Sequence, residues 1–150
     1  MQSGDKEAAS ACNCQTLRMA ARYTTAVYDK ALSPSGLRVT QFTILYRLRQ
    51  RGPMEVKPLA ASMAMDRTTL AANLKPLERD GLVRLTVNPS DRRARLIEIT
   101  EDGAGRVETC VPLWRAAQKS FEQSYGAAKA ATMRSLMADV LKTGLEPWAE

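Results

Sequence analysis

The chain has 150 residues, of which 45% are hydrophobic and 25% are charged, and its net charge is +6. This length predicts a single domain over residues 1–150 with a real buried core, and the positive charge favours a nucleic-acid partner. The sequence contains no histidine, so imidazole metal ligands and Ser-His or Cys-His catalytic pairs are excluded. We therefore expect a protein that is not an enzyme.

The sequence gives no sign of export or membrane insertion. No run approaches the roughly 18 apolar residues of a membrane-spanning helix. The first residues, MQSGDKEAASAC, lack the apolar core of a secretory signal. Three cysteines, Cys12, Cys14 and Cys110, are too few for a secreted disulfide framework. We expect a cytoplasmic protein without a membrane partner.

The N-terminal part has the apolar periodicity of two helices. Apolar and small residues recur at helical spacing over residues 12–32, and this helix should stop before the turn sequence Ser33-Pro34-Ser35-Gly36. A second helix should begin with Thr40 as N-cap and end at Gly52-Pro53. Its apolar side predicts a core element, formed by Phe42, Ile44, Leu45 and Leu48.

The stretch from Val56 to Thr100 has the order helix, turn, helix, strand, strand. A short helix is predicted over Lys57–Met63, and Asp66 should cap the next one. The buried side of that helix is expected to be Leu70, Leu74 and Leu77, with Gly81 just past its end. Strands are predicted over residues 82–87 and 96–100, on either side of a basic loop over residues 88–95. This is the order of a helix-turn-helix followed by a β wing.

Two further helices are expected after the wing. Thr100 should cap a long helix with Glu101 and Asp102 in its first turn, and Gly126 should separate it from a last helix. The predicted fold is mainly α with a small β wing: a winged helix-turn-helix over about 38–100, flanked by helices over about 12–32 and 101–148. The apolar faces of the flanking helices exceed what the module can cover, which predicts a homodimer. The alternative is a helical bundle within one chain.

The exposed positions of the second helix of the motif suit DNA reading. Arg67 could contact a guanine or a phosphate, Asn73 could pair with adenine, and threonine methyl groups could touch thymine. The candidate positions on this helix are Arg67, Thr68, Thr69, Asn73 and Lys75. One alternative is an ordinary solvated helix face. Another is a winged-helix module that binds protein, but its recognition face should be apolar or acidic.

The predicted wing tip combines one carboxylate with three guanidinium groups. Arg92, Arg93 and Arg95 could contact phosphates or a narrow minor groove of double-stranded DNA. Asp91 is predicted to structure the wing by orienting an arginine through a charge-assisted hydrogen bond. Such contacts would raise affinity with little base information.

Several segments resemble MarR-type transcriptional regulators. The resemblance rests on LRMAARYTTAVYDKALSPSGLRVTQFTILYRL, MDRTTLAANLKPLERDGLV and the wing NPSDRRARLIEIT, and so covers nearly the whole chain. It implies a homodimer, often a repressor, that binds palindromic promoter DNA. The recognition helix then falls on residues 66–79, the wing aspartate on Asp91 and the wing arginine on Arg93. The chain departs from many relatives at Ala71-Ala72, where they carry Thr-Arg, which leaves the operator sequence open.

The resemblance also implies that a small aromatic anion or an oxidant relieves DNA binding. The ligand would lie between the flanking helices and the winged module. Candidates for holding a small aromatic carboxylate or phenolic effector are Arg18, Arg22, Tyr23 and Tyr46. The alternative is that these arginines are surface charges and these tyrosines pack in the core.

The cysteines suggest a second input. A thiol near the start of the first helix is a candidate redox sensor, which points to Cys12 or Cys14, and Cys110 could join across a dimer. Two thiols one residue apart could also hold a soft metal, although no histidine completes such a site. The alternative is that they are unreactive, and we expect no bound cofactor or metal.

Overall fold

The computed structural model describes residues 11–149, so the first ten residues and Glu150 of the predicted domain lie outside the described residues. The elements, in chain order, are α2 (Asn13–Leu32), η1 (Ser33–Ser35), α3 (Val39–Arg51), β1 (Met54–Glu55), α4 (Val56–Ser62), α5 (Arg67–Arg79), β2 (Val83–Asn88), β3 (Asp91–Ile99), α6 (Glu101–Tyr125) and α7 (Ala127–Val140). The predicted class, mainly α with a small antiparallel sheet, is confirmed. None of the helices within residues 11–149 is long and apolar enough to cross a membrane.

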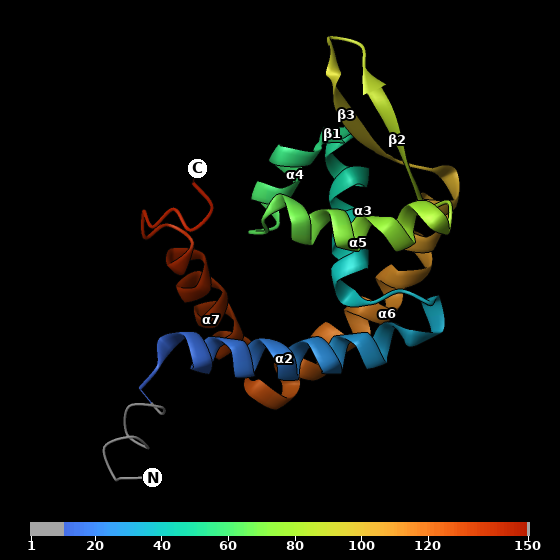
Figure 1. Cartoon of the computed structure of the whole chain (residues 1–150). Helices are drawn as coiled ribbons and strands as arrows, with labels where there is room; N and C mark the ends of the chain where they lie inside the picture. The colour runs from blue at the N-terminus through green and yellow to red at the C-terminus, as the bar shows by residue number, and fades with distance from the viewer. Residues whose placement is uncertain (1–10, 150) are drawn as a thin grey trace, which may run out of the picture.

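The helix-turn-helix is formed by α4 and α5, and the wing by the β2–β3 hairpin, which extends beyond the helical body (Figure 1). The core of this module is made of aliphatic side chains from α3, α4, α5 and the sheet. Leu45, Leu48, Leu59, Leu70 and Ile97 are fully buried. The predicted apolar sides of α3 and α5 both point into this core.

Two predicted helix caps are confirmed and one is wrong. The side chains of Asp66 and Thr100 accept backbone N–H groups at the starts of α5 and α6. The second predicted helix begins at Val39, before the expected cap at Thr40. Asp29 of α2 accepts the Val39 N–H at 2.7 Å, so a contact between helices fixes this start.

The sheet differs from the prediction in two ways. Residues 54–55 form a short strand that the sequence pattern did not indicate, because its backbone pairs with the distant Ile97 and Leu96. The strand β3 begins at Asp91 rather than at residue 96, so most of the predicted loop belongs to the hairpin. The tip of a two-stranded hairpin has no buried face. Its polar residues therefore show no alternation of apolar and polar positions by which the strand could be predicted.

The C-terminal helix is shorter than predicted and poorly covered. It ends at Val140, so Leu145 lies beyond it, after Gly144 in a left-handed conformation with φ of 80°. Ala130 is the buried residue of α7, whereas its C-terminal half exposes Leu136, Met137 and Val140. These side chains do not close a bundle within one chain, which was the alternative to a dimer.

The wing and α6 meet in a close backbone contact at Thr100. Its N–H donates to the Leu82 carbonyl at 3.0 Å, and its hydroxyl donates to the Gly81 carbonyl at 2.6 Å. Gly103, in the first turn of α6, lies so close that a Cβ would overlap the Leu82 carbonyl oxygen. This junction therefore requires glycine at position 103.

We expect Gly103→Ala to lower the free energy of unfolding by about 1–3 kcal/mol, because the new methyl group meets fixed backbone. The matched control is Gly105→Ala, since a Cβ there meets nothing within 4 Å. That substitution should raise the free energy by up to about 1 kcal/mol, through helix propensity. Urea unfolding of both variants measures the difference. Equal stabilities of the two variants would contradict the close contact.

Candidate nucleic-acid interface and ligand pocket

The first turn of α5 presents an ordered polar surface. The Oδ1 of Asp66 accepts the Thr69 N–H at 2.6 Å, and this hydrogen bond lowers the pKa of the Asp66 carboxyl. The cap fixes where the helix starts and leaves Arg67, Thr68 and Thr69 exposed in its first turn. A helix of this kind presents its N-terminal residues to base edges when it enters a major groove.

The next turn of α5 offers fewer free polar groups than the sequence suggests. Ala71 and Ala72 are exposed and contribute no polar group. The Asn73 side chain is half-buried and donates from Nδ2 to the Thr69 carbonyl at 2.9 Å. This bond uses one of the two N–H groups of the Asn73 amide and fixes the orientation of the side chain. Lys75 is exposed farther along the helix.

The turn between α4 and α5 contains an unusual backbone conformation. Ala64 has φ of 51°, in the left-handed region that favours glycine. The N–H of Met65 donates to the Ala60 carbonyl at 2.9 Å, which closes the turn around Ala64. The turn sets the angle between the two helices of the motif.

The wing tip is an irregular hairpin that carries the predicted arginines. Val87 pairs with Arg95 and Asn88 pairs with Asp91, so residues 92–94 form a bulge in β3. The Oδ1 of Asp91 accepts the backbone N–H of Arg93 at 3.0 Å. Asp91 thus structures the tip through the backbone. This hydrogen bond to the Arg93 N–H takes the place of the expected bond to an arginine side chain. Arg92, Arg93 and Arg95 are exposed.

The structure distinguishes arginines with partners from those without. Among the described residues the ion pairs are Arg49–Glu108, Arg79–Asp80, Arg84–Glu98 and Arg134–Glu122. The Arg84–Glu98 pair lies across the wing, and its hydrogen bond lowers the pKa of Glu98. The wing-tip arginines and Arg67 do not belong to these pairs. Their guanidinium groups remain available for phosphates.

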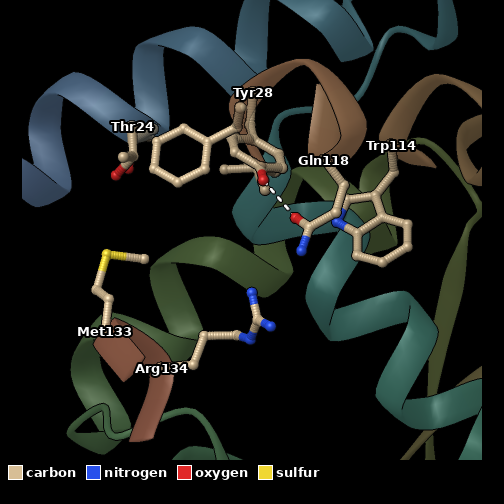
Figure 2. A pocket seen from close by; sticks show the side chains of 9 residues that line it. Thr24, Tyr28, Trp114, Gln118, Met133 and Arg134 are labelled. Atoms are coloured by element: carbon tan, nitrogen blue, oxygen red, sulfur yellow. Dashed lines mark hydrogen bonds between the residues drawn. The ribbon is translucent and has the colours of Figure 1, made fainter. Parts of the chain in front are cut away.

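A hollow of about 340 Å³ opens where α2, α6 and α7 come together. Its lining is mostly apolar and aromatic, with a few polar groups: Thr24, Thr25, Tyr28, Val39, Trp114, Gln118, Phe121, Met133 and Arg134. Met133 and Arg134 face Tyr28 and Gln118 across the hollow (Figure 2). Pockets of this size and character accommodate small organic ligands.

A chain of hydrogen bonds connects the three helices at this hollow. The Tyr28 hydroxyl donates to Gln118 Oε1 (Figure 2). The Gln118 amide donates in turn to Glu122 at 3.2 Å. Arg134 donates to the same Glu122 oxygen at 3.1 Å. Burial, followed by the charge of Glu122, raises the pKa of Tyr28, which keeps its hydroxyl protonated. One guanidinium group is thus present at the rim, already paired.

The effector residues predicted from sequence lie elsewhere. Arg18, Arg22 and Tyr23 are exposed on α2, with Tyr23 71% exposed, and Tyr46 is exposed on α3 beside Phe42. None of these four residues lines the hollow in the described part of the chain. The lining residues Trp114, Gln118 and Phe121 share one face of α6 through their spacing of four and three. That spacing was a usable signal, but it indicated an apolar face rather than a pocket.

The three cysteines fall into two environments. Cys12 and Cys14 are exposed, and the Cys12 sulfur accepts the Gln15 N–H at the start of α2. Cys110 is buried in the core, and burial raises the pKa of its thiol. Within residues 11–149, no group of three or more Cys, Asp or Glu side chains is placed to hold a metal ion.

Comparison with known proteins identifies the class of this module. The model of the MarR family matches residues 37–94, which span α3 to the wing tip. The transcriptional regulator MosR of M. tuberculosis, solved in complex with DNA, is 37% identical. Its TM-score is 0.77, and the alignment covers 89% of this chain and 99% of that one. The chain belongs to the MarR family.

Two curated MarR-like relatives extend the comparison. The HTH-type transcriptional repressor NicR of Pseudomonas putida is 32% identical over 99 residues. That match spans 66% of this chain and 63% of NicR, so more than a third of NicR lies outside it. The organic hydroperoxide resistance transcriptional regulator of Bacillus subtilis is 30% identical over 100 residues, which are 67% of this chain and 68% of that protein.

We expect Arg93→Ala to weaken binding to any duplex and to lower the slope of log affinity against log salt by about 1, because one phosphate contact is lost. The control is Arg22→Ala, which removes the same charge from α2, far from the wing (Figure 1). Fluorescence anisotropy with a labelled random duplex at several salt concentrations gives both slopes. An unchanged slope for Arg93→Ala, or an equal change for Arg22→Ala, would contradict the assignment of the wing.

Proposed function

We propose that this MarR-family protein is a sequence-specific DNA-binding repressor that acts as a homodimer on pseudo-palindromic promoter DNA. The main support is that one packed module exposes both the first turn of α5 and a bulged wing with unpaired arginines. A polar, basic recognition face argues against the alternative winged-helix module that binds protein. The names of two relatives, a repressor and a regulator solved with DNA, agree with the proposal.

The exposed apolar residues of the flanking helices support the homodimer. Met19 and Tyr23 of α2 and Leu136, Met137 and Leu141 at the C-terminal end are largely exposed. A second copy could cover them, since large exposed apolar side chains often mark interaction sites. A two-fold dimer would present two α5 helices about 34–36 Å apart, one turn of DNA. We place the protein in the cytoplasm, where promoter DNA is accessible.

The hollow between α2, α6 and α7 supports release by a small aromatic anion. Tyr28, Trp114 and Phe121 provide ring contacts, and Arg134 provides the cationic group that a carboxylate needs. The carboxylate of the ligand would compete with Glu122 for Arg134. This site replaces the exposed Arg18, Arg22, Tyr23 and Tyr46 as our first candidate.

The experiment is footprinting on the DNA beside the protein's own gene, with and without salicylate. We expect protection of two half-sites one helical turn apart, and loss of protection when salicylate is added. Arg134→Gln should need about tenfold more salicylate, because a charge-assisted hydrogen bond is worth about 1.5–3 kcal/mol. Arg22→Gln is the control and should respond like the wild type.

The outcomes separate the parts of the proposal. Absence of salt-sensitive binding to this DNA and to random duplex would exclude the regulator. Protection by a monomer on one half-site would exclude the dimer. If Arg22→Gln needs more salicylate for release while Arg134→Gln responds like the wild type, the effector site would return to the exposed face of α2.

A redox-sensing regulator is the second candidate. Cys12 and Cys14 are exposed at the start of α2, and one relative is named as an organic hydroperoxide resistance regulator. The thiolate is the species that peroxides oxidise, so the buried Cys110, with its raised pKa, should react slowly. Cys14→Ser should stay on DNA at peroxide concentrations that release the wild type, as measured by gel shift. Equal release of both proteins would exclude Cys14 as the sensor.

A further inference from the structure

A side-chain hydrogen bond connects the wing to the segment that precedes the helix-turn-helix. The Asn88 amide donates from Nδ2 to Glu55 Oε1 at 2.7 Å, across 33 positions of the chain. Both residues are half-buried. We call this Glu55–Asn88 contact the wing brace.

The position of Glu55 makes the wing brace informative. Glu55 ends β1, where its backbone pairs with Leu96, and it is also the residue immediately before α4. At a helix start the short side chains of Asp, Asn, Ser and Thr commonly accept N–H groups of the first turn, and Glu55 occupies this position before α4. In α4 it makes no such bond, and the described residues place Asn88 against it instead.

Asn88 connects Glu55 to the irregular tip. It is the last residue of β2, and its Oδ1 accepts the Ser90 N–H at 2.9 Å, which orders the turn. The sheet order β1-β3-β2 places β3 between the two partners, so the bond reaches across β3. The bulge over residues 92–94 directly follows this turn and carries Arg92 and Arg93. The brace therefore acts on the part of the hairpin that has the least regular pairing.

A carboxylate in this place should otherwise reduce DNA binding. Glu55 lies in the sheet whose tip carries the arginines, and its negative charge repels phosphates. A flexible tip would in addition lose conformational freedom when it binds. We propose that Glu55 is a positioning residue for DNA binding: through Asn88 it holds the wing tip so that Arg92 and Arg93 meet the duplex. This inference rests on the proposed DNA-binding function.

The test compares Glu55→Ala with Glu55→Gln on a labelled random duplex between about 50 and about 200 mM salt, a range over which phosphate contacts are measurable. Glutamine keeps an oxygen acceptor for Asn88 and removes the charge. We expect Glu55→Ala to lower affinity about fivefold and the salt slope by about 1, as for one lost phosphate contact. Glu55→Gln should bind as tightly as the wild type or more tightly. Asn88→Ala, which removes the donor, should resemble Glu55→Ala.

A double-mutant cycle with Arg93→Ala distinguishes positioning from general destabilisation. If Glu55 acts through the tip, Glu55→Ala should have a smaller effect once Arg93 is absent, because only the contact of Arg92 remains to be lost. Thermal unfolding of each variant checks that the module stays folded at the assay temperature. If the alanine variant is unstable, the DNA affinity of Glu55→Gln can still be compared with that of the wild type.

Equal tightening by Glu55→Ala and Glu55→Gln would show a charge effect alone and overturn the inference. Equal weakening of DNA binding by both Glu55 variants would also overturn it, as would additive effects of Glu55→Ala and Arg93→Ala on the binding free energy. If Arg93→Ala itself leaves binding unchanged, the wing does not contribute to the proposed DNA binding. The positioning role of Glu55 would then fail together with the assignment of the wing.

Discussion

The backbone contact around Thr100 is the constraint on which the arrangement depends. At this point the wing ends, α6 begins, and the Leu82 carbonyl lies against Gly103. A side chain at position 103 would push the long helix away from the sheet. The contact therefore fixes the direction in which α6 leaves the reading module. Because α6 also lines the hollow and leads into α7, the same contact relates wing, pocket and flanking helices.

The helices and the exposed polar face of α5 could be predicted because their signals are local. Asp66 and Thr100 are caps with short-range geometry, and Leu70, Leu74 and Leu77 repeat with the helix. The strand at Met54–Glu55 could not be predicted, since it exists only through pairing with β3. The pocket was missed for a similar reason. Its lining comes from α2, α3, α6 and α7, and no single segment contains the pattern. Asn73 shows the limit for single residues, since its amide is bound to its own helix.

The net charge indicates a DNA-binding surface only after the arginines that are bound to groups within the chain have been set aside. Arg84 and Arg134 carry positive charge, yet each has a carboxylate within 3.1 Å. Arg106 is used inside the chain, where it donates to the Ser35 carbonyl at 2.9 Å. The arginines of the wing tip have no such partner among the described residues, and they stand on an arm with few apolar contacts. Charge that is exposed, unpaired and held by backbone geometry suits an extended polyanion better than a single counter-ion.

The small buried surface of α7 has a consequence for how the protein behaves in a cell. A helix that buries Ala130 alone within its own chain receives little stability from that chain. In the proposed dimer, most of its stability would come from the partner, so order in α7 would rise with protein concentration. Dilution would then loosen the wall of the hollow that carries Met133 and Arg134. The amount of this protein in the cell would thus set its sensitivity to ligand as well as its occupancy of DNA.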